Sequence, residues 1–554
     1  MFLDLKLRSS LVKILPNAKT PSGVDYNNAS ALKGELVHFQ VVWKANFQYG
    51  KIYIRADSPL KQSIVLRTVE LVPVDYFPPE MDTDAVGVKI GLYPDLLREI
   101  PRNVLSTVCG QWCSVWVSVT IPENCTAGKY PVKLFFDCFD IVEKCSAMFA
   151  SPVFTLTVLD AVLPEQTLKN TNWLHVDAIA SFYHVRVFSE KHWRLIQKFV
   201  KSAVSLGVNM LYTPLFTPPL DTEVGSERIT AQLIGIRYRN EEYQFDFSRL
   251  DRWVDMGLAC GIRYFEMSHF FTQWGARFTP KILAEVSGKT MQIGGWDVPA
   301  TSLQYEAFLA AFLPQLRAFW LKRRLYDRVY FHCSDEPHIE DIHSYGLASA
   351  LMYKYLPDGQ HCDALSRIEV FRNSHCQIPI VCERALEDFK AEDLPEKWTY
   401  YCCEPFRNYP NRFIYMNSVR NRILGTLLYR YQIDGFLHWG FNFYFSRLAR
   451  ARSNPYRDTT AGRAFPAGDA FLVYPGVGGK IEHSIRGIVF HEALQDQRKL
   501  QLLGTCIGRE KVENLLDAFG GKKHLSMTDF PTTEKRFIEM QRIINKTLAE
   551  SILT

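Results

Sequence analysis

The middle of the chain alternates short apolar runs with long amphipathic stretches, and this alternation constrains the fold more than any other feature. Eight runs rich in aromatic and β-branched residues occur between residues 170 and 439. Segments with apolar residues at helical spacing separate most of these runs. Strands that alternate with helices are typical of βα units around a parallel sheet. Eight such units predict a TIM-type (β/α)8 barrel.

The predicted strands lie at 170–175, 208–213, 262–267, 328–334, 362–371, 378–382, 398–403 and 434–439. The fifth unit is poorly defined, so the barrel is expected to be irregular there. Long segments at 214–246 and 269–301 follow the second and third strands. They are expected to wall the mouth of the barrel, because strand-to-helix loops surround barrel sites.

The segments on either side of the barrel predict two further domains. Residues 1–160 contain short alternating runs separated by Pro, Gly and Asn turns, which is typical of a β-sandwich. The barrel is expected over 161–465. Residues 466–554 predict one more strand, at 470–475, and helices packed on the barrel. The predicted fold class is a multidomain α and β protein with a small C-terminal extension.

Composition and charge restrict the functional class. A hydrophobic content of 47% with 22% charged residues is typical of a folded globular protein. The net charge of +5 contains no long Lys/Arg block, so no nucleic-acid partner is expected. No apolar run approaches the roughly 20 residues that cross a bilayer, and the first ten residues do not predict a signal peptide. We expect a cytoplasmic protein without a membrane partner; a homo-oligomer is compatible with the sequence.

The cysteines do not form a recognisable metal or disulfide framework. There are 13, an odd number, scattered along the chain, and reduced thiols are the simplest interpretation. Cys402 and Cys403 form the only vicinal pair, and no His/Cys spacing suits zinc. We therefore expect neither a metal nor a cofactor.

Two adjacent carboxylates follow the fourth predicted strand. Asp335 and Glu336 come directly after it, and Pro337 stops the strand. In an α/β barrel the carboxyl ends of the strands carry the chemistry. Two carboxyl groups are also the minimum equipment for acid-assisted glycoside cleavage. The position of this pair predicts an active site; a salt-bridged strand end is the alternative.

Seven short motifs follow one another in the second half of the chain, at 334–337, 398–405, 410–414, 420–425, 434–442, 474–476 and 484–486. In this order they resemble glycoside hydrolase family 123 and the related uncharacterised domain family 4091. The resemblance implies a β-N-acetylgalactosaminidase with a β-sandwich and a catalytic barrel. Its partner would be an oligosaccharide or glycoconjugate with a terminal amino sugar.

The resemblance also implies a substrate-assisted retaining mechanism. In such a mechanism the 2-acetamido oxygen of the substrate attacks the anomeric carbon. Glu336 corresponds to the general acid/base. Asp335 corresponds to the residue that holds the acetamido N–H and stabilises the oxazolinium intermediate. Adjacency suits these two roles, because vicinal side chains leave the backbone in different directions.

Glu404, after the seventh strand, departs from the expected pattern. An acid/base after strand four and a nucleophile after strand seven would form an ordinary double-displacement site for another sugar class. Glu404 could therefore be a direct nucleophile, a substrate ligand or a structural carboxylate. A third hypothesis is a non-catalytic carbohydrate-binding protein that keeps the barrel.

Other polar and aromatic residues near the strand ends could bind sugar hydroxyls or form the wall under the ring. Each could equally be a satisfied core residue. Trp439 is the best candidate for an aromatic platform, and Tyr401 for a partner of the acetamido group. His332 is expected to support the pair rather than react. The remaining candidates are His175, Asp177, His438, Asn442 and Tyr444.

Overall fold

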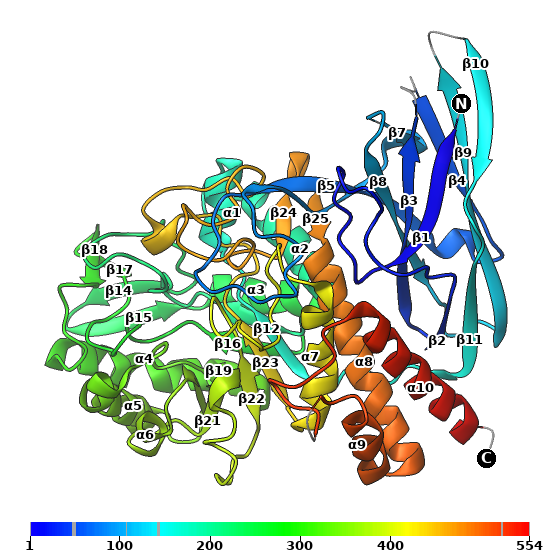
Figure 1. The fold of residues 1–554 in the computed structure, drawn as a ribbon. Coiled ribbons are helices and arrows are strands. Elements are labelled where there is room, and N and C mark those ends of the chain that lie inside the picture. The colour runs from blue at the N-terminus through cyan, green and yellow to red at the C-terminus, as the bar shows by residue number, and fades with distance from the viewer. Residues whose placement is uncertain (1, 47–50, 107, 141–143, 522–523, 553–554) are drawn as a thin grey trace.

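The computed structural model describes all residues except 1, 47–50, 107, 141–143, 522–523 and 553–554. Figure 1 shows the barrel and its helices on one side and an N-terminal β-sandwich on the other. The C-terminal helices lie between and below them. The predicted sandwich followed by a TIM-type barrel is confirmed. Among the described residues, no helix combines the length and apolar character needed to span a membrane.

The sandwich forms because strands such as β9 (Gly128–Asp140) alternate buried apolar residues with more exposed ones. Leu134 and Phe136 of β9 share a core with Val115, Val117 and Val119 of β8 (Trp112–Thr120), a strand that is buried on both faces. Such alternation lets two sheets pack face to face. The N-terminal strands are β1 (Leu3–Ser9), β2 (Asn28–Lys33), β3 (Leu36–Ala45), β4 (Lys51–Asp57), β5 (Ile64–Val74), β6 (Gly91–Glu99), β7 (Val104–Leu105), β8 (Trp112–Thr120), β9 (Gly128–Asp140), β10 (Cys145–Ala150) and β11 (Phe154–Val162).

One sheet of the sandwich is completed by strands that follow the barrel. Its order is β1-β3-β8-β5-β6-β25-β24, and the second sheet runs β2-β11-β9-β4-β7 with β10 beside β9. β24 (Val473–Pro475) and β25 (Ile481–Ser484) are antiparallel, and β25 pairs with β6. The strand expected at 470–475 therefore joins the N-terminal sheet.

Eight parallel strands close the barrel in the order of the chain. The first and last strands pair with Lys169 opposite Gly435 and Thr171 opposite Leu437. Large side chains such as Trp398 and Tyr212 fill the interior. The strands are β12 (Lys169–Asn172), β13 (Met210–Thr213), β16 (Tyr264–Met267), β19 (Val329–Phe331), β20 (Gln360–Leu365), β21 (Ile378–Cys382), β22 (Trp398–Tyr400) and β23 (Gly435–His438).

Some boundaries differ from the sequence prediction. The first strand ends at Asn172 because a short helix, α1 (Val176–Tyr183), follows almost at once. The fifth strand is regular, but only a five-residue helix, α6 (Ile368–Arg372), comes after it, which explains its weak helical periodicity. The helix between the seventh and eighth strands begins at Ser418, where the Asn417 side chain accepts the Val419 N–H as an N-cap.

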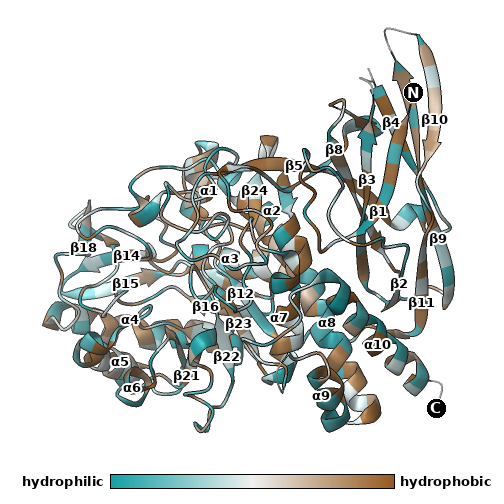
Figure 2. Ribbon diagram, viewed as in Figure 1, coloured by the Kyte–Doolittle hydropathy of each residue, from teal (hydrophilic) through white to brown (hydrophobic). Residues whose placement is uncertain are grey.

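Most of the longer helices begin where the sequence offers a capping side chain. Ser189, Ser302 and Ser484 each accept the N–H of the residue three positions on. Figure 2 shows that the C-terminal helices carry both hydrophobic and hydrophilic residues. The helices besides α1 and α6 are α2 (Glu190–Ser205), α3 (Ser248–Cys260), α4 (Leu303–Lys322), α5 (Ile342–Tyr355), α7 (Ser418–Arg430), α8 (Ile485–Ile507), α9 (Arg509–Asp517) and α10 (Glu534–Ile552).

The two long segments after the second and third strands contain a small sheet that the sequence analysis did not predict. Its order is β15-β14-β17-β18. The segments also reach the barrel mouth, through residues before this sheet in each of them. The strands are β14 (Gly235–Arg239), β15 (Glu242–Asp246), β17 (Ile282–Val286) and β18 (Lys289–Gly294).

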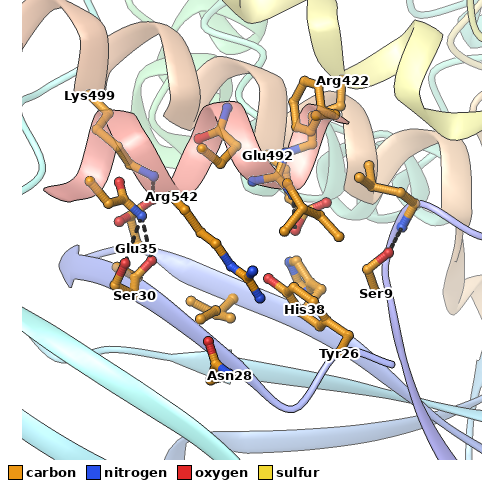
Figure 3. A pocket seen from close by; sticks show the side chains of 18 of the residues that line it. Ser9, Tyr26, Asn28, Ser30, Glu35, His38, Arg422, Glu492, Lys499 and Arg542 are labelled. Carbon is orange, nitrogen blue, oxygen red and sulfur yellow. Dashed lines mark hydrogen bonds and ion pairs between the residues drawn. The ribbon is translucent and has the colours of Figure 1, made fainter. Parts of the chain in front are cut away.

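A buried charge network joins the N-terminal sheet to the C-terminal helices (Figure 3). The Lys499 ammonium lies 2.8 Å from Glu35, and the Arg422 guanidinium lies 2.8 Å from Asp496. Ser10 donates a 2.8 Å hydrogen bond to Glu492, and burial raises the pKa of that carboxyl to about 7. Paired charges at this depth fix how the segments dock, because leaving one unpaired is costly.

Candidate active site

A pocket of about 320 Å³ opens at the carboxyl ends of the barrel strands. This is the face on which barrel enzymes build their sites. Asp335 and Glu336 lie in its wall, between aromatic side chains and the long loops. The lining residues are Trp173, Leu220, Asp221, Gln273, Trp274, Asp335, Glu336, Ala364, Tyr400, Cys402, Cys403, Leu437, Trp439, Arg447, Ala464 and Phe465.

The main chain that carries the two carboxylates is fixed on both sides. Asp363, in the next strand, accepts the backbone N–H groups of Cys333 and Ser334 at 3.0 and 3.2 Å. The carbonyl of Asp335 accepts the backbone N–H of Trp274 at 2.9 Å. The strand end is therefore held by a neighbouring strand and by a loop, which preorganises the pair.

Glu336 is aimed by an unusual backbone conformation. Its φ of 44° lies in the left-handed region, which a residue with a Cβ adopts at some cost. The Tyr400 hydroxyl donates a 2.5 Å hydrogen bond to Glu336 Oε1. Burial and the nearby Glu336 carboxylate raise the pKa of Tyr400 well above its usual value. Tyr400 thus remains a hydrogen-bond donor to Glu336.

Asp335 has the environment of a carboxyl that resists ionisation. Burial, followed by the adjacent Glu336 charge, raises its pKa well above the usual value, and His332 opposes this shift. Two neighbouring carboxyl groups with different partners can divide the work of acid and anion between them. The pair is therefore equipped for proton transfer and for stabilising positive charge.

A charged histidine lies beneath the pair. His332 Nε2 is 2.6 Å from Glu266, and its Nδ1 is 3.2 Å from Asp363. Burial opposes the imidazolium, yet the Cys362 thiol and these two carboxylates raise its pKa well above the usual value. His332 consequently supports the strand end through Asp363 and lowers the cost of charge on Asp335.

Three buried side chains here could in principle meet around a metal ion. They are His269, His332 and Asp363, with one potential ligand atom of each within 4.8 Å of the others. Both ring nitrogens of His332, however, face carboxylates, and its raised pKa favours the protonated ring. A protonated imidazole cannot ligate a metal. The arrangement fits an ion-paired support better than a metal centre.

One protein-family model matches more than half of the chain. Residues 173–503 match the family described as glycoside hydrolase 123, catalytic domain. This protein belongs to glycoside hydrolase family 123. Membership makes it a glycosidase by family and implies a carbohydrate substrate. No curated protein matches its sequence.

One solved structure shares the fold over nearly the whole chain. A family 123 glycoside hydrolase from Clostridium perfringens, studied for glycolipid glycan hydrolysis, matches with a TM-score of 0.72 at 15% identity, over 99% of this chain and 98% of that one. This likeness shows a common fold. β-Glucuronidases from Parabacteroides merdae (TM-score 0.28, 8% identity, 79% and 50% covered) and Dictyoglomus thermophilum (0.30, 9%, 84% and 96%) also match.

The structure brings three of the predicted site residues of this family 123 protein to the pocket: Asp335, Glu336 and Trp439. His332 is fully buried and does not line the pocket, and its supporting role stays a prediction. Glu404 is exposed and is not among the lining residues, although Cys402 and Cys403 are. Its pKa is raised by partial burial, against the effect of two nearby arginines.

The other candidates make contacts outside the pocket. His175 and Asp177 both bind the buried Arg228, with the Asp177 oxygens at 2.8 Å. The Asn442 side chain bonds the backbone of His175, and the Tyr444 hydroxyl bonds the Val473 carbonyl. These contacts give the polar groups hydrogen-bond partners within the barrel rim. The role of these four residues in substrate binding stays a prediction.

Tyr401 and His438 lie on the outer side of the barrel wall. Tyr401 packs among apolar residues of α7 and α8, and its ring contacts His438. Tyr400 is the residue that faces the pocket. Strand alternation puts neighbours on opposite sides, so Tyr400, and not the predicted Tyr401, contacts the pocket. Trp173 and Trp274, which were not among the predicted site residues, line the pocket from other loops.

Proposed function

We propose that this family 123 protein is a retaining exo-β-N-acetylgalactosaminidase or related hexosaminidase that uses the substrate's 2-acetamido group as nucleophile. The observation that carries the proposal is the placement of Asp335 and Glu336 side by side in one pocket, with Tyr400 bonded to Glu336. A related family 123 enzyme acts on glycolipid glycans, which supports a glycoconjugate substrate.

Glu336 supplies the proton that leaves with the aglycone. Its carboxyl protonates the glycosidic oxygen while the acetamido oxygen closes on the anomeric carbon. The resulting carboxylate then takes a proton from water as the water opens the oxazolinium ring from the same face as the departed aglycone. Two inversions at the anomeric carbon give net retention. The hydrogen bond from Tyr400 stabilises Glu336 while it is a carboxylate, between the two proton transfers.

Asp335 orients the acetamido group and stabilises the positive charge that develops on it. As an anion it accepts the acetamido N–H and stabilises the positive charge that develops on the ring. An interaction that strengthens during the reaction lowers the barrier rather than merely binding substrate. The His332 imidazolium below favours the ionised form of Asp335, although burial opposes it.

Aromatic side chains give the pocket its apolar walls. Trp439 is fixed by a 3.0 Å hydrogen bond from its indole N–H to Asp469 and can cover one face of the terminal sugar. Trp274 is 41% exposed, with a φ of 55°, and its backbone N–H binds the Asp335 carbonyl. We assign Trp274 to the aglycone side, because an exposed indole at the rim offers a stacking surface beyond the terminal sugar.

The position of Glu404 favours this mechanism over ordinary double displacement. A direct nucleophile must lie about 5–5.5 Å from the acid/base across the anomeric carbon, within the same pocket. Glu404 is exposed and does not line that pocket. The intact carboxylate pair also favours an enzyme over a purely carbohydrate-binding protein.

A panel of 4-nitrophenyl β-glycosides with and without a 2-acetamido group tests the proposal. We expect turnover of the N-acetylgalactosaminide or N-acetylglucosaminide and none of the galactoside or glucoside. A thiazoline mimic of the cyclic intermediate should inhibit competitively. Turnover of the galactoside, with a 2-deoxy-2-fluoro sugar trapped on Glu404 in mass spectra, would replace the proposed mechanism by double displacement.

A further inference from the structure

Two adjacent thiols lie in the same pocket as the catalytic carboxylates. Cys402 and Cys403 both line it, are partly exposed, and have their sulfur atoms 3.9 Å apart. The proposed reaction uses neither thiol. A vicinal pair facing a pocket is unlike the scattered buried cysteines of the barrel, such as Cys333 and Cys376.

The turn that carries the thiols is held by several hydrogen bonds. Asn411 Nδ2 donates to the carbonyls of Cys402 and Pro405, both at 2.9 Å. The backbone N–H of Cys402 donates to the Glu404 carbonyl at 3.0 Å. Asn411 is itself fully buried. The two sulfur atoms are consequently presented by a fixed backbone, and a ligand that bridges them need not order a mobile loop.

The spacing of the thiols suits bidentate binding of one soft atom. Two thiolates bound to one tetrahedral centre at about 2.3 Å each lie about 3.8 Å apart. A trigonal-pyramidal centre such as arsenic(III) brings them somewhat closer, so small side-chain rotations suffice from the 3.9 Å separation already present. Soft thiolate ligands select thiophilic elements over the hard cations that carboxylates prefer. The neighbouring Asp335 and Glu336 therefore do not compete for the same class of ion.

We propose that Cys402 and Cys403 form a chelating site for thiophilic Lewis acids, trivalent arsenicals in particular, and that its occupation closes the sugar pocket. With an organoarsenic(III) oxide, two S–H bonds break and two As–S bonds form. The arsenic-bound oxygen leaves as water with both protons, and arsenic stays trivalent. The contact with Cys403, together with burial, raises the pKa of Cys402 well above its usual value, so a reagent that removes the thiol protons itself is favoured.

Intact-protein mass spectrometry with one equivalent of phenylarsine oxide tests the binding step without any glycosidase assay. We expect a single adduct that 2,3-dimercaptopropanol removes and 2-mercaptoethanol does not. Peptide mapping of the modified wild-type protein should place the arsenic on the segment that contains residues 402 and 403. An adduct that maps elsewhere, or no adduct at one equivalent, would overturn the proposal. This test uses only the wild-type protein, so it does not depend on whether any variant folds.

Cysteine variants and activity provide the second arm. Cys402→Ser and Cys403→Ser should each lose the dithiol-reversible adduct, whereas Cys506→Ser, which changes an exposed cysteine of α8, should keep it. The arsenical-loaded wild-type protein should lose at least nine-tenths of its hydrolysis of the panel substrate and regain it with the dithiol. A full adduct with undiminished turnover would refute closure of the pocket. This arm rests on the proposed function, whereas the mass measurement does not.

Discussion

At the scale of single residues, the site depends on how two neighbouring carboxyl groups are made different. Glu336 takes a left-handed backbone conformation and a hydrogen bond from Tyr400. Asp335 is partly buried, and the His332 imidazolium opposes the rise in its pKa that burial and Glu336 cause. Acid and anion roles can then be divided within one dipeptide because each side chain has its own surroundings.

The acid/base role of Glu336 predicts a leaving-group dependence. Glu336→Gln should lower kcat/KM by about 10²–10⁴-fold on substrates with poor leaving groups, since it removes proton transfer. The loss should shrink for 4-nitrophenolate or better leaving groups. The measurement is kcat/KM across aryl glycosides of graded leaving-group pKa, with circular dichroism as the folding control. A folded variant with wild-type rates would refute the role.

The anionic role proposed for Asp335 predicts effects on kcat and on the pH profile of activity. Asp335→Asn should lower kcat more than it raises KM, because the lost interaction grows in the transition state. Glu404→Gln is the matched carboxylate control and should change kcat only modestly. If Asp335 acts as an anion, activity falls as pH drops through its raised pKa, so the acidic limb should lie above the usual aspartate range of about 3.9. Equal losses in both variants would contradict this assignment.

The contacts of His332 predict that divalent ions are dispensable. Its ring nitrogens lie 3.2 and 2.6 Å from carboxylate oxygens and its pKa is raised well above the usual value, so we expect an imidazolium without a lone pair for a metal. Exhaustive dialysis against a chelator should leave kcat/KM unchanged, as measured beside an undialysed sample and by metal analysis of the protein. Activity that is lost on chelation and restored by one divalent ion would show a metal site.

At the scale of elements, buried ion pairs determine how the C-terminal helices dock. Lys499 of α8 and Glu35 near β3 are 3% and 5% exposed, and they join segments far apart in sequence. Arg422 of α7 binds Asp496 and Glu492 of the same helix α8. Buried pairs contribute little net stability but make removal of one partner costly, so they act as docking constraints.

Lys499→Met should lower the free energy of unfolding by about 3–5 kcal/mol, because Glu35 would remain buried without its partner. Lys546→Met is the matched control, since Lys546 pairs with Glu550 on the exposed face of α10 at 76% and 65% exposure. That change should shift stability by less than about 0.5 kcal/mol. Urea unfolding of the two variants compares them directly; equal stabilities would contradict a docking role for the buried pair.

At the scale of the whole molecule, the chain leaves the N-terminal sheet, builds the barrel and returns to the same sheet. β25 pairs with β6, and Arg486 of α8 binds Asp95 of β6 as a buried ion pair at 2.9 Å. The Lys13 ammonium also donates to the backbone carbonyls of residues 413, 414 and 416. Sandwich, barrel and C-terminal helices therefore share core and hydrogen bonds.

This shared sheet predicts that the barrel does not fold by itself. A chain that begins at residue 161 should be insoluble or should lack near-ultraviolet circular dichroism, because the edges of β25 and the buried Arg486 would lose their partners. The full chain should unfold in one transition when followed by both fluorescence and far-ultraviolet dichroism. Two separate transitions, or a soluble and cooperatively folding fragment, would contradict this prediction.

The sequence by itself determined the sandwich, the eight barrel strands and the position of Asp335-Glu336 at a strand end. These features follow from local periodicity and turn chemistry, which short segments carry within themselves. The β21 strand at Ile378–Cys382 coincides with its predicted range. The family motifs are equally local, which explains why the family could be identified from the order of short segments.

Tertiary structure decided which polar residues face the pocket. Tyr400 rather than Tyr401 points inward because pairing with the neighbouring strands sets the parity of β22, and one residue of offset exchanges the two sides. Arg228, from a distant loop, engages His175 and Asp177. The return of β24 and β25 to the first sheet likewise depends on long-range pairing. Contacts between residues tens to hundreds of positions apart leave no local periodicity, so only the folded chain could determine them.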